Sequence, residues 1–370
     1  MNFDFSEDQR LLQQTARDFL DEQSPLTVCR EVLESDQPYA AELWKSTAEM
    51  GWQGAVIPEE YGGAGFGYLE LAMIAQEVGR ALAPIPFSSS VYLATEAILT
   101  AGSDEQKQRY LPRLASGESI GTLAMVEKPG QNGVDAIETR LEGGKLSGAK
   151  TAVADGDIAD IAIVPAKSAG GLSLALVELD AGGVERKRLT SFDPSRSMAS
   201  LRLDGAPAEL LGAEGEGAEL LDRVLDRAAV LMAFEQVGGA ERAFELTVEF
   251  AQGRYAFGRP ISSFQALKHR MADMWVEVQL ARSNTYYGIW ALSNEDEELA
   301  IAAAAARISA CKAYELQTTE MIQIHGGVGF TWEYDCHMFF RRAKLLAVIL
   351  GNPSTWKDKL VSRVAARKAA

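Results

Sequence analysis

A long helical pattern stops at the stretch Gln323-Ile324-His325-Gly326-Gly327-Val328-Gly329-Phe330. Two other long helical patterns are separated by the stretch Arg254-Tyr255-Ala256-Phe257-Gly258-Arg259-Pro260, which is followed by Phe264-Gln265. Glycine lets a backbone approach a ligand closely. An arginine fork suits phosphate, and a glutamine amide can pair with a phosphate oxygen or a base edge. Either stretch alone is more simply explained as a helix cap and a tight turn. Taken together, the glycines, the arginine and the glutamine of the two stretches are residue types that suit a phosphate-bearing ligand.

Helical patterns occupy both ends of the chain. Residues from about 6 to 118 read as helical, with Ser6 as the first cap and with breaks at Pro58 and the glycines after it. Long helical patterns return after the Gly-rich segment 212–217, at about 218–252, 263–292, 297–325 and 335–349.

The middle of the chain has a different character. Short apolar runs at 121–126, 158–164 and 172–179 lie between Gly- and Asp-rich turns and predict β-strands. The order of patterns therefore predicts an N-terminal α-helical domain at 1–120, a middle β-domain at 121–210 and a C-terminal α-helical bundle at 211–370.

Composition excludes several classes of protein. The formal net charge of -16 and the pI near 4.8 argue against nucleic acid or an anionic membrane surface as partner, and a phosphate-bearing ligand would need a local basic patch. The apolar runs are too short to span a bilayer. The 3 cysteines and 3 histidines lack metal-ligand or disulfide spacing, so we expect no metal site. These features, with an acidic N-terminus unlike a signal peptide, predict a cytoplasmic protein.

The whole chain resembles the acyl-CoA dehydrogenase family. Gly51-Trp52 with Ile57-Pro58-Glu59-Glu60-Tyr61-Gly62-Gly63 is similar to its Gly-Trp…Pro-Glu-x-x-Gly-Gly signature, and Leu111-Pro112-Arg113-Leu114-Ala115-Ser116-Gly117 to its domain-closing segment. The resemblance implies an N-terminal α-helical domain, a middle β-barrel domain and a C-terminal four-helix bundle. It also implies FAD as cofactor, an acyl-CoA substrate, an electron-transfer flavoprotein as partner, and a homo- or hetero-tetramer.

The resemblance implies two groups of FAD-binding positions. Residues that match the family's contacts to FAD phosphate and adenosine across a subunit interface are Arg254, Phe257, Gln265, Gln323, His325, Gly326, Gly327 and Gly329. On the flavin side, the family's Thr-Glu-Pro-x-x-Gly-Ser-Asp becomes Val126-Glu127-Lys128-Pro129-Gly130-Gln131-Asn132-Gly133, and its Trp-Ile-Thr becomes Ala152-Val153-Ala154. Val126 and Ala154 therefore offer the flavin only backbone groups.

The catalytic base of the family is also missing from its usual places. The family's reaction needs a carboxylate that removes the α-proton of the thioester. Its two alternative positions fall at Leu350 and Ala228, and neither side chain can accept a proton. We interpret the nearby Asp226 as a solvated helix-surface charge paired with Arg223 or Arg227. Glu235, on the same helix face as Ala228 but about 10 Å along the axis, remains a candidate base.

Three functions are consistent with this sequence. The first is an FAD-dependent acyl-CoA dehydrogenase that introduces a trans α,β double bond into a CoA thioester and passes electrons to an electron-transfer flavoprotein. The second is a base-less partner subunit of a hetero-oligomeric acyl-CoA dehydrogenase, of the kind known for bulky substrates such as sterol side chains, that completes the partner's FAD site. The third, a non-redox CoA-thioester binding protein, would need both halves of the flavin site degraded, and only one is.

Overall fold

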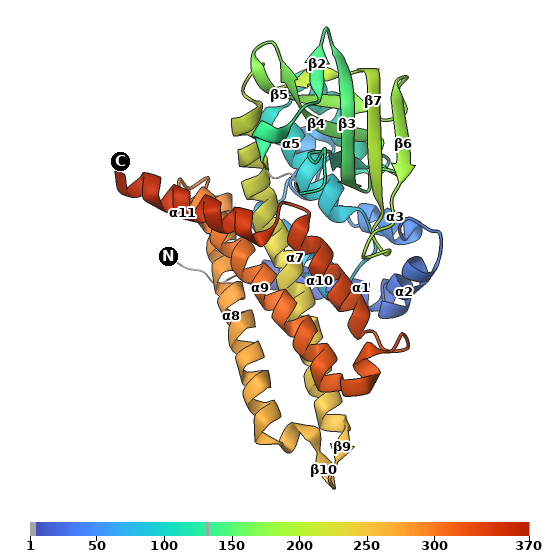
Figure 1. Ribbon diagram of the computed structural model, residues 1–370, viewed down its shortest axis with the longest axis vertical. Helices are drawn as coiled ribbons and strands as arrows, with labels where there is room; N and C mark the ends of the chain where they lie inside the picture. The colour runs from blue at the N-terminus through green and yellow to red at the C-terminus, as the bar shows by residue number, and fades with distance from the viewer. Residues whose placement is uncertain (1–4, 131–132, 370) are drawn as a thin grey trace. The chain divides into compact units, whose positions relative to one another are not determined.

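The computed structural model describes residues 5–130 and 133–369 (Figure 1). Residues 1–4, Gln131, Asn132 and Ala370 lie outside the described residues, so two positions of the flavin-side run are not covered. The first third of the chain is helical, as expected, and the Ser6 hydroxyl caps the first helix by accepting from the Gln9 backbone N–H. Its main elements are α1 (Glu7–Gln23), α2 (Leu26–Glu34), α3 (Ala41–Glu49), α4 (Tyr68–Arg80), a π-helical segment (Ser88–Thr95), α5 (Glu96–Ala101) and α6 (Asp104–Ala115).

The middle of the chain forms a sheet in the order β6-β7-β3-β2-β4-β5-β8, with β1 paired to β4. The expected runs at 158–164 and 172–179 become β4 and β5, whose consecutive residues 161–166 and 173–177 are buried on both faces of the sheet. The sheet strands are β1 (Gly121–Leu123), β2 (Arg140–Glu142), β3 (Lys145–Ala154), β4 (Ile161–Ser168), β5 (Gly171–Glu178), β6 (Val184–Arg188), β7 (Met198–Pro207) and β8 (Glu209–Leu211).

The C-terminal part is a set of long helices, and the four expected helical patterns are confirmed. They correspond to α7 (Gly217–Gly253), α8 (Gln265–Ser293), α9 (Leu299–His325) and α10 (Cys336–Val348). A further helix that the sequence patterns did not predict, α11 (Pro353–Ala369), follows them. The predicted fold class, helical at both ends with a β-domain between, is therefore confirmed.

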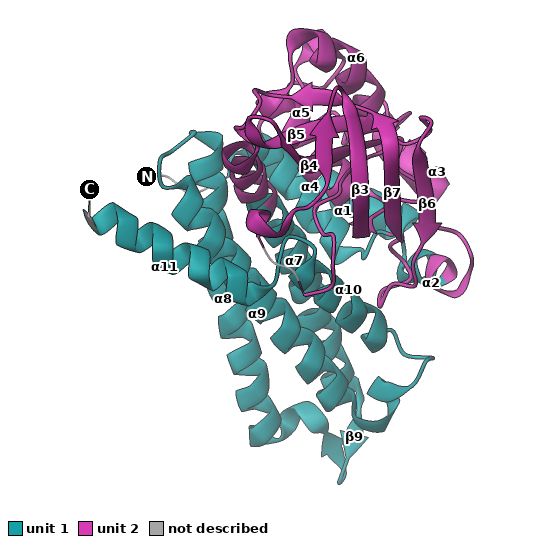
Figure 2. Cartoon of the chain, turned by 45° about the horizontal axis from the view of Figure 1, so that its top comes forward, with its two compact units in different colours: residues 1–30, 68–83, 229–370 teal, residues 31–67, 84–228 magenta. Residues whose placement is uncertain are grey.

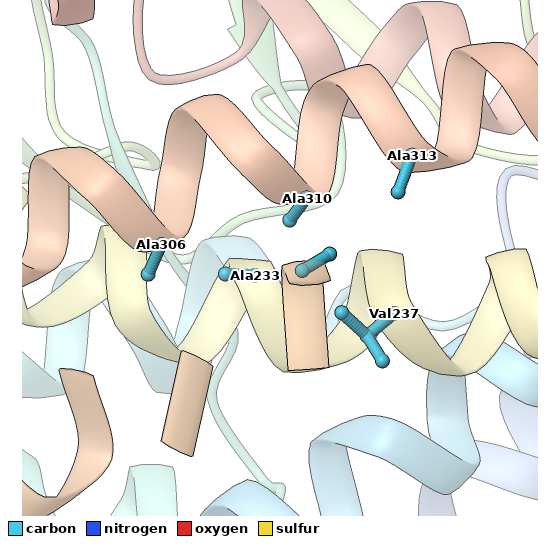
Figure 3. Packing of buried hydrophobic residues seen from close by; sticks show 6 residues of the cluster. Ala233, Val237, Ala306, Ala310 and Ala313 are labelled. Atoms are coloured by element: carbon cyan, nitrogen blue, oxygen red, sulfur yellow. The ribbon is translucent and has the colours of Figure 1, made fainter. Parts of the chain in front are cut away.

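Small side chains allow the long helices of the bundle to approach closely. Ala233 and Val237 of α7 face Ala306, Ala310 and Ala313 of α9, and α8 adds Ala281 to the cluster (Figure 3). Each of these side chains is fully or almost fully buried. Because alanine carries little side-chain volume, the contact depends on complementary backbones and tolerates no larger residue without strain.

The chain divides into two compact units (Figure 2). One contains residues 1–30, 68–83 and 229–370, and the other contains residues 31–67 and 84–228. The three-domain division at residues 120 and 210 stays a prediction. Among the described residues, no helix is both long and apolar enough to cross a membrane.

Candidate functional site

The ends of three helices meet at one end of the bundle. Ala251 near the end of α7, Met274 in α8 and Ile324 near the end of α9 form one buried cluster. This packing places the hairpin that follows α7 and the glycine turn that follows α9 at the same end. The hairpin consists of β9 (Tyr255–Ala256) and β10 (Arg259–Pro260) and extends past the helices that it joins (Figure 1). The two sequence stretches that suit a phosphate-bearing ligand are thus brought together.

A cleft of about 550 Å³ lies at this end and contains a residue from each stretch. Arg254, at the end of α7, supplies a guanidinium, and His325, at the end of α9, supplies an imidazole. The other lining residues are Leu26, Leu246, Glu249, Phe250, Gly253, Met321, Tyr334, Asp335 and Cys336.

His325 is held in a defined orientation in this cleft. Its Nδ1 lies 2.7 Å from the Met321 carbonyl oxygen, which can only accept, so Nδ1 carries the proton. The ring stacks on Phe250 with centroids 3.9 Å apart and meets Tyr334 edge-on. Burial lowers the pKa of His325. The ring is therefore neutral near pH 7, and Nε2 is a hydrogen-bond acceptor.

The hairpin holds Phe257 in a strained and exposed position. The residue has a φ of 53° and its side chain is 95% exposed. A bulky residue in the left-handed region is an outlier that persists only where the surrounding structure imposes it. Here the hydrogen bond from the Ile261 N–H to the Arg254 carbonyl (2.8 Å) closes the hairpin, and the ring of Phe257 meets the ring of Phe264 edge-on with centroids 6.2 Å apart. An aromatic face is thereby presented to solvent, where a nucleobase could stack on it.

The three glycines of the turn after α9 serve different purposes. Gly326 has φ 62° and ψ -137°, a conformation open essentially to glycine alone. A Cβ on Gly326 or Gly327 would meet no atom within 4 Å, so the backbone there is open to a ligand. A Cβ on Gly329 would lie 2.5 Å from the Ile322 carbonyl oxygen, so this glycine is needed for packing. Gln323 and Gln265 are exposed, and the Gln265 amide contacts the His269 ring.

The flavin-side positions lie in the β-containing unit and are partly engaged by other groups. The Val126 carbonyl accepts from the Thr151 N–H (2.7 Å), and the Ala154 carbonyl accepts from the Thr122 hydroxyl (2.6 Å). Ala152, where the family has tryptophan, has a φ of 51° at an irregularity in the β3–β7 pairing. No side-chain donor or aromatic ring is offered by these three positions. Their role toward a flavin stays a prediction.

A buried ion pair fixes the segment that carries Val126. The Lys150 ammonium donates to Glu127 (2.7 Å) and to the Pro165 carbonyl (2.9 Å), and the backbone N–H groups of Glu138 and Thr139 also donate to Glu127. Burial alone would raise the pKa of Glu127, but these hydrogen bonds outweigh it and bring the pKa down to about 2. Sequence reasoning assigned no role to this pair.

Replacing Glu127 by glutamine is expected to lower the free energy of unfolding by about 3 kcal/mol at pH 7, because Lys150 would stay buried without its counter-charge. The folded pKa of about 2 lies below the ordinary value of 4.5, so the ionised carboxylate stabilises the fold fully above pH 4.5 and stops doing so as the pH falls through 2. Urea unfolding at pH 7 and pH 3 should therefore show a smaller difference in the free energy of unfolding between wild type and Glu127→Gln at pH 3.

Glu138→Gln, which breaks the exposed Lys128–Glu138 pair, is the control and should lower the free energy of unfolding by less than about 1 kcal/mol at pH 7. An equal loss in both variants would contradict this prediction.

The two positions of the family's base are buried and apolar. Leu350 is 3% exposed, lies between α10 and α11, and its carbonyl accepts from the Trp356 indole (2.9 Å). Ala228 lies inside α7 and is fully buried. Glu235, the remaining candidate, is also fully buried, and its charge acts on the guanidinium of Arg307. Burial lowers the pKa of Arg307.

The interpretation of Asp226 as a solvated surface charge was wrong. Its exposure is 5%, because this first part of α7 is covered on that side. Arg223 pairs with Glu219 (2.9 Å), and Arg227 lies 3.8 Å from the fully buried carboxylate of Glu96 at the start of α5. Sequence reasoning missed Glu96. The available signal was an acid within the run from Val91 to Leu99, which is mostly apolar apart from Thr95.

Comparisons with known proteins agree with this geometry. The family models "Acyl-CoA dehydrogenase, N-terminal domain" and "Acyl-CoA dehydrogenase, C-terminal domain" match residues 6–118 and 215–363. Acyl-CoA dehydrogenase IpdE2 of Mycolicibacterium smegmatis is 35% identical over 97% of this chain and 99% of its own length. Butyryl-CoA dehydrogenase from Megasphaera elsdenii has a similar structure, with a TM-score of 0.88, 25% identity and coverage of 99% of this chain and 100% of that chain. A chain of the ChsE4-ChsE5 complex from Mycobacterium tuberculosis gives a TM-score of 0.88, 28% identity and 99% coverage of both chains.

Proposed function

This chain belongs to the acyl-CoA dehydrogenase family of oxidoreductases, and we propose that it uses the end of its helical bundle to bind the ADP part of FAD. The substrate class is a CoA thioester, and the reaction is its α,β-dehydrogenation with electrons passed to an electron-transfer flavoprotein. When bound, FAD supplies the hydride acceptor for this reaction. The observation that carries the proposal is that Arg254 and His325, from separate stretches of sequence, line one cleft.

The groups at this end suit a dinucleotide. Arg254 offers a fork that matches pyrophosphate oxygens, and the open backbone at Gly326 and Gly327 allows close approach. The exposed ring of Phe257 offers a face on which adenine can stack. These features account for a strained aromatic residue and two unpacked glycines, which a closed monomeric fold would not need.

The buried Leu350 and Ala228 favour a second candidate, the base-less partner subunit. In that arrangement this chain supplies Arg254, Phe257 and the glycine turn to FAD held mainly by another dehydrogenase chain, which also supplies the carboxylate base. The structurally similar ChsE4-ChsE5 is a complex of two different proteins, which supports a hetero-oligomer for this chain as well. The buried free thiols Cys29, Cys311 and Cys336 support a reducing, cytoplasmic location.

Absorbance in the flavin band tests this proposal directly. We expect FAD to co-purify with the chain or with its complex, in an oligomer by light scattering, because the proposed clamp faces a cofactor shared between subunits. A species of about one chain mass that takes up no added FAD, alone or with a base-bearing partner chain, would reject both candidates. FAD in the purified homo-oligomer would favour the first candidate, and FAD only in a mixed complex would favour the second.

A further inference from the structure

The segment between α9 and α10, residues 326–335, is called the strap here. It begins with the glycine turn, whose backbone at Gly326 and Gly327 is open, and it ends at Asp335, which lines the cleft. Phe330, in its middle, is 82% exposed. Residues 326–330 form a short 3₁₀ helix, after which the Thr331 N–H donates to the Val328 carbonyl (3.1 Å), so contacts to the second half of the strap help to decide where this turn lies.

One such contact comes from the N-terminal part of the chain. Arg30 of α2 donates through Nη1 to the Trp332 carbonyl (2.8 Å) and through Nη2 to the Asp335 carboxylate (2.5 Å). A single guanidinium therefore bridges two points of the strap's second half. The fork geometry sets the separation of these two acceptors, which a flexible ammonium group could not do.

A second contact comes from α10. The indole ring of Trp332 stacks on His337 with centroids 4.4 Å apart, and the Arg341 guanidinium lies 5.5 Å from the same indole. His337 also approaches the Trp332 carbonyl that Arg30 binds (3.3 Å). Trp332 is therefore fixed by its ring on one side and by its carbonyl on the other. Its position in turn limits where the preceding glycine turn can lie.

We propose that Arg30 is a positioning residue for FAD, which it does not touch: it holds the strap so that the glycine turn has its binding conformation before the cofactor arrives. This inference rests on the proposed function, because it takes the glycine turn as part of the FAD site. Pre-organisation of a binding loop raises affinity by removing the entropy cost of ordering it. Loss of Arg30 should therefore weaken cofactor binding while the helices of the unit stay folded.

The test compares Arg30→Ala and Arg30→Lys with Arg80→Ala in the assembled protein that carries FAD. Arg80 is the matched control, because it also forms a two-pronged pair between helices, with Glu245. Amide hydrogen exchange of peptides covering 326–335 gives a readout that needs no activity. We expect exchange there to be roughly tenfold faster in Arg30→Ala, on the scale of one charge-assisted hydrogen bond, and unchanged in Arg80→Ala. The FAD dissociation constant should rise roughly tenfold in Arg30→Ala, and less in Arg30→Lys.

Several outcomes would overturn the inference. These are unchanged exchange in the strap, a loosened strap with unchanged FAD affinity, or the same loss of FAD in Arg80→Ala at an equal change in melting temperature. Arg254→Ala, measured in parallel, separates this inference from the proposed function. If Arg254→Ala leaves FAD affinity unchanged but Arg30→Ala lowers it, the cleft assignment fails and the role of Arg30 stands. If neither variant changes FAD affinity, both fail.

Discussion

The isolated chain should oxidise acyl-CoA thioesters at least about a hundredfold more slowly than an acyl-CoA dehydrogenase that carries a carboxylate at one of the two base positions. A positioned general base contributes about 10²–10⁴-fold to such a step, and Leu350 and Ala228 cannot accept a proton. Both residues are buried, so water is poorly placed to substitute for the missing carboxylate. A dye-coupled assay under saturating FAD, over acyl-CoA substrates from short chains to sterol side chains, measures this rate.

Glu235 supplies the control for that assay. If the unmodified homo-oligomer turns over rapidly and Glu235→Gln abolishes turnover while FAD content is kept, Glu235 is the base and the partner-subunit candidate is wrong. The buried setting of Glu235 beside Arg307 argues for a structural charge instead, so Glu235→Gln should mainly lower stability.

Placing glutamate at Leu350 or Ala228 tests whether the thioester and the flavin are bound in positions that allow the reaction. A gain of tenfold or more from either change would show that the missing base alone limits the chain.

Regular helices were the part of the fold that the sequence predicted best. The four long C-terminal patterns match α7 to α10 within a few residues, because apolar residues recur at helical spacing over many turns. The helix α11 was missed because its residues are mostly polar. Its Trp356 is nonetheless fully buried, and Arg363 donates to the Ala300 carbonyl of α9 (2.6 Å), contacts that no periodicity reveals.

Buried polar contacts were the part that the sequence did not predict. Ser88 and Ser89 are poor helix formers, yet they are fully buried in the π-helical segment Ser88–Thr95. Ser89 donates to Asp155 (2.6 Å) and Ser88 accepts from Arg196 (2.6 Å), so contacts from residues far along the chain stabilise the segment. Asp226 was misread for a similar reason, because burial depends on what covers a helix and not on the helix itself.

The sequence predicted those residues of the candidate site that belong to a recognisable local motif. The Arg254 and Gly326 stretches were recognisable only as a pair, because each alone is typical of a helix cap or a tight turn, and the structure brings them together. Glu249 and Tyr334, which line the same cleft, have no such signal. The contacts of Arg30 could not be predicted for another reason, because its partners Trp332 and Asp335 lie some three hundred residues away in sequence.

Replacing Arg254 by alanine should weaken FAD binding on the order of 10- to 100-fold and destabilise the oligomer at the same time. The guanidinium is the cation that lines the cleft from the end of α7, and hydrogen bonds between charged groups are the strongest that the site can offer. Because the cofactor would be shared between subunits, release of FAD and loss of the oligomer should occur together. Gln265→Ala should have a milder effect, since an amide supplies no charge. Fluorescence of released FAD and light scattering, on the same samples, measure both quantities.

Arg259→Ala is the control for Arg254, because it removes an arginine from the same hairpin. Arg259 lies over the ring of Phe264, 4.1 Å from its centroid, and it is not among the residues that line the cleft. Its loss removes a cation–π contact and leaves the cleft's charge in place, so FAD affinity should change by less than about threefold. If Arg254→Ala behaves like Arg259→Ala, the stretch from Arg254 to Pro260 is only a structural turn. If FAD is released only from Arg254→Ala, a charge at the end of α7 binds the cofactor, whichever chain supplies the base.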